Sequence, residues 1–271
     1  MMLVTAGELD AYTRDVAAQQ RAAQVYAESS VRAFMELNPG ISVAEVREYA
    51  ITILDQVGRI YGGAGAAISA AEYDRLMASA GIGTDPASAG HAVNREQVEK
   101  TVRFLAGMLV RGDAEGFVSA IGSKAYDAPL RAANSTMAGN ATRDYGRGVR
   151  YARVPTGRET CGFCLMLASR GFTYRSRRLA GDIGNRFNTY HDRCDCRVVA
   201  GTEDTVVEGY DPDALYEVYA ECRAIAEQGA RGTWSELVEA GGTDKPYSKW
   251  LTDRICSTIT RRLRAERGQS S

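Results

Sequence analysis

Apolar residues recur at steps of three and four along most of the first 145 residues, and this spacing limits the fold more than any other feature. A clear example is the series Val46, Tyr49, Ile53, Val57 and Ile60. Such a period is typical of an amphipathic helix packed against a core. Similar patterns predict helices over residues 9–37, 64–80, 98–109 and 114–142. Residues 1–145 are therefore expected to form a helical scaffold.

Local signals mark where several of these helices begin and end. Asn38-Pro39-Gly40 is expected to end the first helix, and Ser42 followed by Glu45 matches a capping box, in which each side chain satisfies a free backbone N–H. The pair Gly62-Gly63 is expected to end the second helix before the next one begins. Gly122 and Gly139 weaken the prediction of one unbroken rod over residues 114–142.

The pattern changes near Gly146. Residues 149–154 alternate and end at Pro155, which favours a short strand, and residues 172–174 and 196–199 are its expected partners. Helical spacing returns after Gly201. The predicted fold is mainly α, with a long helical N-terminal region (1–145), a small α+β zinc-knuckle module (146–201) and a C-terminal helical region (202–271).

The C-terminal region carries its own helix signals. Asp211-Pro212 predicts an N-cap followed by proline at the first helical position. Thr233 with Glu236 matches a second capping box, and a last helix is expected over residues 250–263.

Composition sets limits on the partners and on the cysteine chemistry. The formal net charge is −1, which favours neither nucleic acid nor membrane for the chain as a whole, and no apolar run is long enough to span a bilayer. The first ten residues lack the basic and apolar regions of a secretory signal. We therefore expect a reducing compartment, where the six cysteines are metal ligands or buried thiols rather than disulfides.

Four of the six cysteines and one of the two histidines fall within residues 161–196. The five candidate ligands are Cys161, Cys164, His191, Cys194 and Cys196. Zn²⁺ prefers a tetrahedron of thiolate sulfur and imidazole nitrogen, and the spacings C-x-x-C, H-x-x-C and C-x-C each place two side chains on one side of the backbone. Soft ligands are in surplus, so the sequence predicts a closed, structural zinc site. The preferred set is Cys161, Cys164 and His191 with either Cys194 or Cys196.

Two other interpretations of these cysteines remain open. Thiols of this kind are often buried simply as small apolar groups. A redox C-x-x-C is disfavoured, because that motif belongs to a βαβ pattern and does not need the distant H-x-x-C-x-C. Cys222 and Cys256 lie in helical patterns and are expected to be core residues.

The stretches Tyr151-Ala152-Arg153-Val154-Pro155, Cys161-Gly162-Phe163-Cys164 and His191-Asp192-Arg193-Cys194-Asp195-Cys196 resemble the MuF-like head-morphogenesis family of tailed bacteriophages, in the form found in actinobacterial phages and prophages. The resemblance covers residues 148–200. This sequence differs from the commoner pattern His-Pro-Asn-Cys-Arg-Cys, because Asp192 and Arg193 follow His191 and Asp195 stands between the cysteines. The resemblance implies a structural minor capsid protein in the head interior, present in the host cytoplasm during assembly. Such a protein contacts portal or capsid protein and acts in head assembly, DNA packaging or DNA delivery.

Arginine is concentrated around the cysteines. Residues 143–197 contain twelve arginines, no lysine and five acidic residues, within a chain of net charge −1. A basic module of this kind is suited to non-specific, salt-dependent contact with DNA phosphates, and a solvated face or an acidic protein partner is an equal alternative. The candidate contact residues are Arg150, Arg153, Arg170, Arg175, Arg177, Arg178, Arg193 and Arg197.

Other function classes have less support in the sequence. A head-maturation protease needs a base beside its nucleophile, and only His91 and His191 are histidines. A zinc-dependent nuclease would use His191 with Asp192. Because neither forms a convincing catalytic constellation, we expect a protein that is not an enzyme. A zinc-containing regulator lacks a tandem of fingers or a helix-turn-helix reader.

Overall fold

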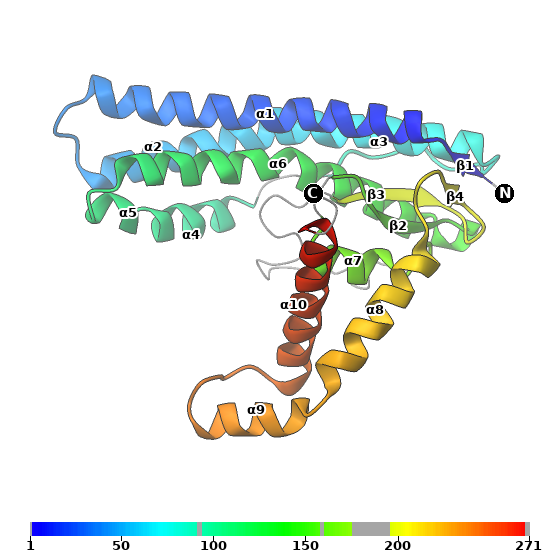
Figure 1. The fold of residues 1–271 in the computed structure, drawn as a ribbon. Coiled ribbons are helices and arrows are strands. Elements are labelled where there is room, and N and C mark those ends of the chain that lie inside the picture. Colours follow the sequence, from blue (N-terminus) through cyan, green and yellow to red (C-terminus); the bar gives the residue numbers. More distant parts are fainter. Residues whose placement is uncertain (1, 91–93, 158–159, 175–195, 269–271) are drawn as a thin grey trace.

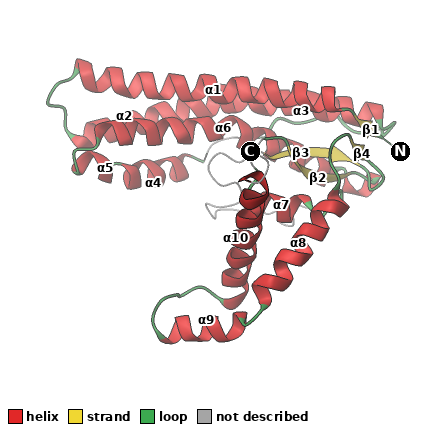
Figure 2. Ribbon diagram, viewed as in Figure 1, coloured by secondary structure: helices red, strands yellow, loops and turns green. Residues whose placement is uncertain are grey.

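The structure is a computed structural model, and it describes residues 2–90, 94–157, 160–174 and 196–268. The chain is mainly helical, as the sequence predicted. Long helices lie side by side in a bundle, two small two-stranded sheets lie at one end of it, and an arm of three helices projects from that end (Figures 1 and 2). No helix in the described part of the chain is long and apolar enough to cross a membrane.

The bundle is formed by the N-terminal half of the chain. Its elements are α1 (Ala6–Leu37), α2 (Val43–Val57), α3 (Gly63–Ser79), α4 (Arg95–Leu105), α5 (Gly107–Val110) and α6 (Ala114–Arg143). The capping box at Ser42 and Glu45 is confirmed: the Glu45 amide donates to Ser42 Oγ, and the Ser42 amide donates to the Glu45 carboxylate. Thr5 and Glu8 form a second capping box at the start of α1, which the sequence reading missed.

One predicted interruption of the bundle helices is absent, and the helix expected over residues 114–142 is continuous. The pair Gly62-Gly63 does not interrupt the helix, because α2 continues through a π-helical turn, η1 (Gly58–Gly62), directly into α3. α6 runs unbroken through Gly122, Pro129 and Gly139. Tertiary packing explains this, since sixteen of the thirty residues of α6 are buried.

Glycine permits the closest helix contact in the bundle. An added Cβ at Gly65 of α3 would lie 2.4 Å from the backbone oxygen of Pro129 in α6. The two helix backbones therefore approach each other directly at this point.

Two small sheets follow the bundle. β2 (Arg150–Pro155) pairs antiparallel with β3 (Cys196–Gly201), with Arg153 opposite Val198, which confirms two of the three predicted strands. The third, residues 172–174, was wrong: only Tyr174 pairs, through an isolated bridge to Tyr151. The sequence reading also missed a parallel pair, β1 (Leu3–Val4) with β4 (Val206–Val207).

One hydrophobic core joins the strands to the bundle. It contains Val16 of α1, Tyr73 of α3, Met137 of α6, Tyr151 of β2 and Val198 of β3, all fully buried. The core therefore continues across residue 146, where the sequence predicted a domain boundary. The 3₁₀ turn η2 (Tyr145–Arg147) carries the chain from α6 into β2.

The C-terminal arm consists of α8 (Pro212–Glu227), α9 (Ala230–Glu239) and α10 (Tyr247–Gly268), and the short helix α7 (Gly162–Ala168) packs at its base (Figure 1). The predicted cap at Asp211 is confirmed, since its carboxylate accepts from the amides of Asp213 and Ala214. The second predicted capping box was wrong. Thr233 and Glu236 lie inside α9, which begins after Gly229 in a left-handed conformation (φ 63°).

Candidate metal centre and basic surface

The described cysteines of the candidate metal site come from α7 and β3. Cys161 is the N-cap of α7, and its sulfur accepts a hydrogen bond from the Cys164 amide at 3.3 Å. C-x-x-C therefore forms the first turn of a helix. Cys196 is the first residue of β3. His191 and Cys194, the other two predicted ligands, lie outside the described residues.

Two of the predicted ligands lie side by side, and the Cys164 thiol donates a hydrogen bond to the Cys196 sulfur. The sulfurs of Cys164 and Cys196 are 3.6 Å apart, and both residues are fully buried. Two thiolates bound to one tetrahedral Zn²⁺ at about 2.3 Å would lie about 3.8 Å apart. Within the described ranges, however, no three Cys, His, Asp or Glu side chains form a group that could hold a metal ion. The described residues alone therefore do not build the predicted zinc module.

A buried arginine completes this cluster. Arg153 of β2 has no exposed surface, and its Nε and Nη2 donate to Cys196 Sγ at 3.2 and 2.7 Å. A guanidinium buried this deeply requires a negatively charged or strongly accepting partner. The Cys196 sulfur accepts two of the hydrogen bonds that Arg153 donates. Sequence reasoning placed Arg153 on a contact surface and missed this role.

A second buried polar residue fixes the start of β3. Asn134 of α6 donates to the Cys196 carbonyl at 3.2 Å and accepts from the Val198 amide at 2.9 Å. Its amide therefore holds the backbone on both sides of Arg197 and positions the Cys196 sulfur. An asparagine inside a helix, directly after the small apolar residues Ala132 and Ala133, was the available signal, because a buried amide needs a partner outside its own helix.

Two tyrosines hold the other end of α7. Tyr174 donates to the Leu167 carbonyl at 2.5 Å, and Tyr210 donates to the Ala168 carbonyl. Burial raises the pKa of Tyr174 to about 12, so its hydroxyl remains a donor at neutral pH. These bonds satisfy carbonyls that the last turn of a helix leaves without an intrahelical partner.

The predicted basic surface is only partly present. Arg153 and Arg197 are buried, at 0% and 4% exposure, so neither can reach a phosphate, which corrects their assignment as contact residues. Arg150 stacks on the Tyr145 ring at 3.9 Å, and Arg170 is exposed. The remaining candidates, Arg175, Arg177, Arg178 and Arg193, lie outside the described residues.

Arginines outside the predicted set stabilise the fold. Asp144, at the end of α6, accepts from Tyr73 at 2.7 Å and forms ion pairs with Arg143 and Arg147 at 2.6 and 2.8 Å. Arg143 also donates to the carbonyls of residues 85 and 86, which fastens the segment after α3 to α6. Part of the arginine excess is therefore structural.

The structure thus combines a helical scaffold with a cysteine cluster between α7 and β3. The model of the family described as VG15 protein matches residues 4–222, which include the bundle, both sheets and the cysteine cluster. The chain therefore belongs to the VG15 protein family, a family of viral (phage) proteins. Neither the curated proteins nor the solved structures contain a match.

Proposed function

We propose that this chain is a structural minor capsid protein of a tailed phage, of the MuF-like type, that acts in head assembly, DNA packaging or DNA delivery. Membership of a viral protein family across the bundle and the cysteine cluster carries the proposal. The resemblance of residues 148–200 to MuF-like head-morphogenesis proteins adds the location near the portal. The long bundle supplies a rigid scaffold for docking on portal or capsid protein, and no catalytic step is assigned to it.

The proposed location can be tested on purified particles of the phage or induced prophage that encodes the chain. We expect the protein in virions at low copy number, protected from added protease until the heads are opened. Particles made without the gene should fail to assemble, package or deliver DNA. Absence from virions, or normal yields of infectious particles without the gene, would contradict the proposal.

A structural zinc ion is the second part of the proposal. Its supporting observation is the 3.6 Å separation of the Cys164 and Cys196 sulfurs, with Cys161 one helical turn away from Cys164. Cys161, His191 and Cys194 are the candidates for the remaining positions. Bound zinc would link α7 to β3, and Arg153 would balance part of the negative charge of the thiolates.

Elemental analysis of the untagged, reduced chain tests this site. We expect about one zinc per chain in the wild type, and loss of the metal in Cys164→Ser and Cys196→Ser. Cys222→Ser is the matched control, because Cys222 is equally buried but belongs to the separate apolar cluster between α7, α8 and α10. Metal-free wild-type protein, or metal retained in the double variant of Cys164 and Cys196, would remove zinc from the proposal.

Contact with DNA is proposed only as a non-specific accessory role. Among the described candidates, Arg170 is the exposed one. Binding of duplex DNA that weakens steeply with salt and does not depend on sequence would support this role. Cleavage of DNA or of capsid protein by the purified chain, lost on changing His91 or His191, would instead make it an enzyme.

A further inference from the structure

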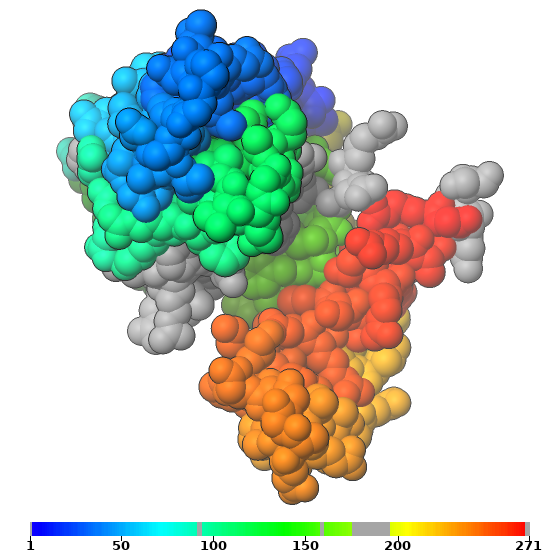
Figure 3. Space-filling model, turned by 90° about the vertical axis from the view of Figure 1, so that its left-hand side faces the viewer, coloured from blue at the N-terminus to red at the C-terminus, as the bar shows by residue number. Residues whose placement is uncertain are grey.

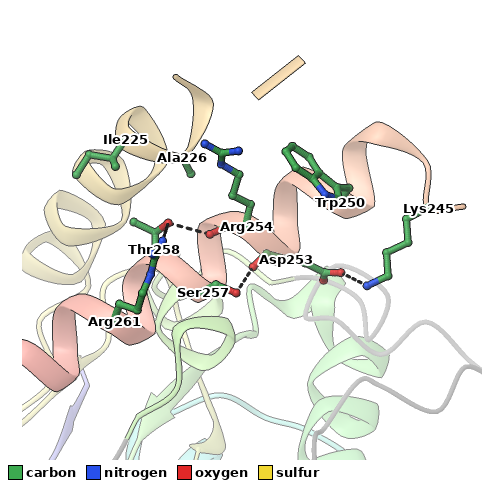
Figure 4. Close-up of a pocket in the computed structure, with 9 residues that line it drawn as sticks. All are labelled: Ile225, Ala226, Lys245, Trp250, Asp253, Arg254, Ser257, Thr258 and Arg261. Atoms are coloured by element: carbon green, nitrogen blue, oxygen red, sulfur yellow. Dashed lines mark hydrogen bonds and ion pairs between the residues drawn. The ribbon is translucent and has the colours of Figure 1, made fainter. Parts of the chain in front are cut away.

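One side of the arm is hollowed between α8 and α10. The hollow has a volume of about 570 Å³ and is lined by Ile225 of α8 and by Trp250, Arg254, Ser257 and Arg261 of α10 (Figure 4). Ile225 is 55% exposed. Arg254 lies over the Trp250 ring at 5.4 Å. Lys245 and Asp253 also line the hollow and form an ion pair at 2.7 Å, so Arg254 and Arg261 supply its excess positive charge.

Charge is divided between the helices of the arm. α8 and α9 carry six acidic residues and two basic ones, whereas α10 carries six basic residues and two acidic ones. One ion pair, Arg262 with Glu221, joins α10 to α8 within the chain. Further charged residues of α8 and α10 remain exposed.

The acidic charges of α8 form a stripe that leads into the hollow. Asp213, Glu217, Glu221 and Ile225 follow one another at intervals of four, so they form a row that turns about 40° around the helix at each step. Ile225 lines the hollow, Glu221 and Glu217 lie next to it in this row, and Asp213, about 120° around the helix from Ile225, faces away from the hollow. Asp213 and Glu217 are exposed, and neither forms an ion pair with another residue in the described part of the chain.

The basic charges of α10 form the matching stripe. Arg254 and Arg261 line the hollow, and Arg264 follows one turn later. Arg261 and Arg264 are exposed, and neither forms an ion pair with a described residue. An acidic helix and a basic helix with apolar contacts between them therefore present one common face to solvent.

We propose that this face binds the same face of a second copy of the chain, so that two arms form a four-helix bundle. α8 leaves the body and α10 returns to it, so the two helices are antiparallel (Figure 1). A two-fold axis along the arm places α8 of each copy on α10 of the other, which brings the acidic stripe onto the basic stripe twice. Ile225 and Trp250 become buried in the centre.

A second copy is favoured over an unrelated partner because both halves of the complementary surface are present on one arm. A surface recognising only an acidic protein or DNA would need the basic stripe of α10 alone. The exposed acidic stripe beside the hollow would then repel that partner. In a symmetric pair, both stripes are neutralised.

Charge reversal tests this pairing in the full chain. One variant carries Glu217→Lys with Glu221→Lys, which makes both stripes basic, and the other carries Arg261→Glu with Arg264→Glu, which makes both acidic. By sedimentation velocity we expect a wild-type dimer that weakens with added salt, and each variant should dimerise about tenfold more weakly or worse. An equimolar mixture of the two variants should recover the dimer, because each basic stripe then meets an acidic one.

The control is Glu236→Lys with Glu239→Lys on α9, which makes the same change in net charge at exposed residues away from the hollow. It should dimerise like the wild type. Recovery on mixing also shows that both variants fold, and circular dichroism checks each one separately. A monomeric wild type, equal weakening by the control, or no recovery on mixing would overturn the proposal. Loss of binding to another virion protein by the arginine variant, with the wild type monomeric, would also overturn it.

Discussion

The bundle and the arm are both helical, but they are stabilised to very different degrees by their own cores. In α6, sixteen of thirty residues are buried, whereas in α10 only Ile255, Thr258 and Ile259 of twenty-two are buried. α9 buries only Ala230. Figure 3 shows the arm, in orange and red, standing apart from the blue and green bundle.

This difference shows that helical spacing in a sequence predicts a helix but not what covers it. The bundle helices bury their apolar residues against one another, so burial of apolar surface stabilises them. The arm has a small cluster at its base, around Leu165, Cys222 and Ile259, and little beyond it. Its outer half is therefore expected to be the less stable part of the monomer.

The same substitution in the two regions should separate them most clearly. Ile121→Ala in α6, where the side chain is fully buried, should lower the free energy of unfolding by about 4 kcal/mol. Ile225→Ala in α8, where the side chain is 55% exposed, should lower it by less than about 1 kcal/mol. Urea unfolding followed by far-UV circular dichroism, at a concentration that keeps the chain monomeric, measures both. Equal losses would mean that the arm has a core of its own.

A substitution at the contact between α7 and α10 should have the next largest effect. A Cβ at Gly162 would lie 2.0 Å from the backbone oxygen of Cys256, so Gly162→Ala should cost about 3 kcal/mol. Hydrogen exchange should accelerate in α7 and α10 while α1 and α6 keep their protection. Gly63→Ala is the control, because nothing lies within 4 Å of its added Cβ and a helical alanine gains up to about 1 kcal/mol. Uniform loss of protection across the chain would show that bundle and arm unfold together.

Acid should weaken the bundle through Asp144. Burial raises the pKa of Asp144, but hydrogen bonds from Arg143 and Tyr73 outweigh it and hold the pKa below its ordinary value of 3.8. The stability from this carboxylate is therefore present above its unfolded pKa and is lost as the pH falls through its folded pKa. Asp144→Asn should lose about 2 kcal/mol at neutral pH and show a flatter acid dependence, measured by urea unfolding at several pH values. An unchanged acid dependence would mean that other carboxylates dominate.

The smallest expected effect needs no substitution. Both tryptophans, Trp234 and Trp250, lie in the arm, so their fluorescence reports on the arm while far-UV circular dichroism is dominated by the bundle. In a denaturant titration, the midpoint of the fluorescence transition should lie at a slightly lower denaturant concentration than the midpoint of the dichroism transition. Coincident transitions would show one cooperative unit.

The sequence predicted the bundle well because its signals are local. The capping box at Ser42, the turn at Pro39 and the cap at Asp211 depend on residues within one helical turn. The break expected at Gly62-Gly63 was wrong because tertiary packing of small residues outweighs the helix propensity of glycine there. The capping box expected at Thr233 failed because the helix had already begun at Ala230.

The candidate site was predicted less completely because its partners are distant in the chain. The spacing of the cysteines brought Cys164 and Cys196 into one hypothesis, and the structure places their sulfurs together. Nothing local distinguishes buried Arg153 from exposed Arg170, since both lie in the same arginine-rich stretch. Asn134 accepts a hydrogen bond from the Val198 amide of β3, which lies 64 residues further along the chain. Burial of this kind depends on the assembled fold.

The parallel pairing of β1 with β4 has a consequence for the order in which the protein matures. Leu3 and Val4 pair with Val206 and Val207, and the Ala6 amide at the start of α1 donates to Glu208 at 2.8 Å. A chain growing on the ribosome makes these first residues about 200 positions before their partners, so this closure follows synthesis of all the bundle helices. The start of α1 therefore becomes paired only after all the other bundle helices have been synthesised. A chain that ended before residue 206 would leave that end of the bundle open to proteolysis.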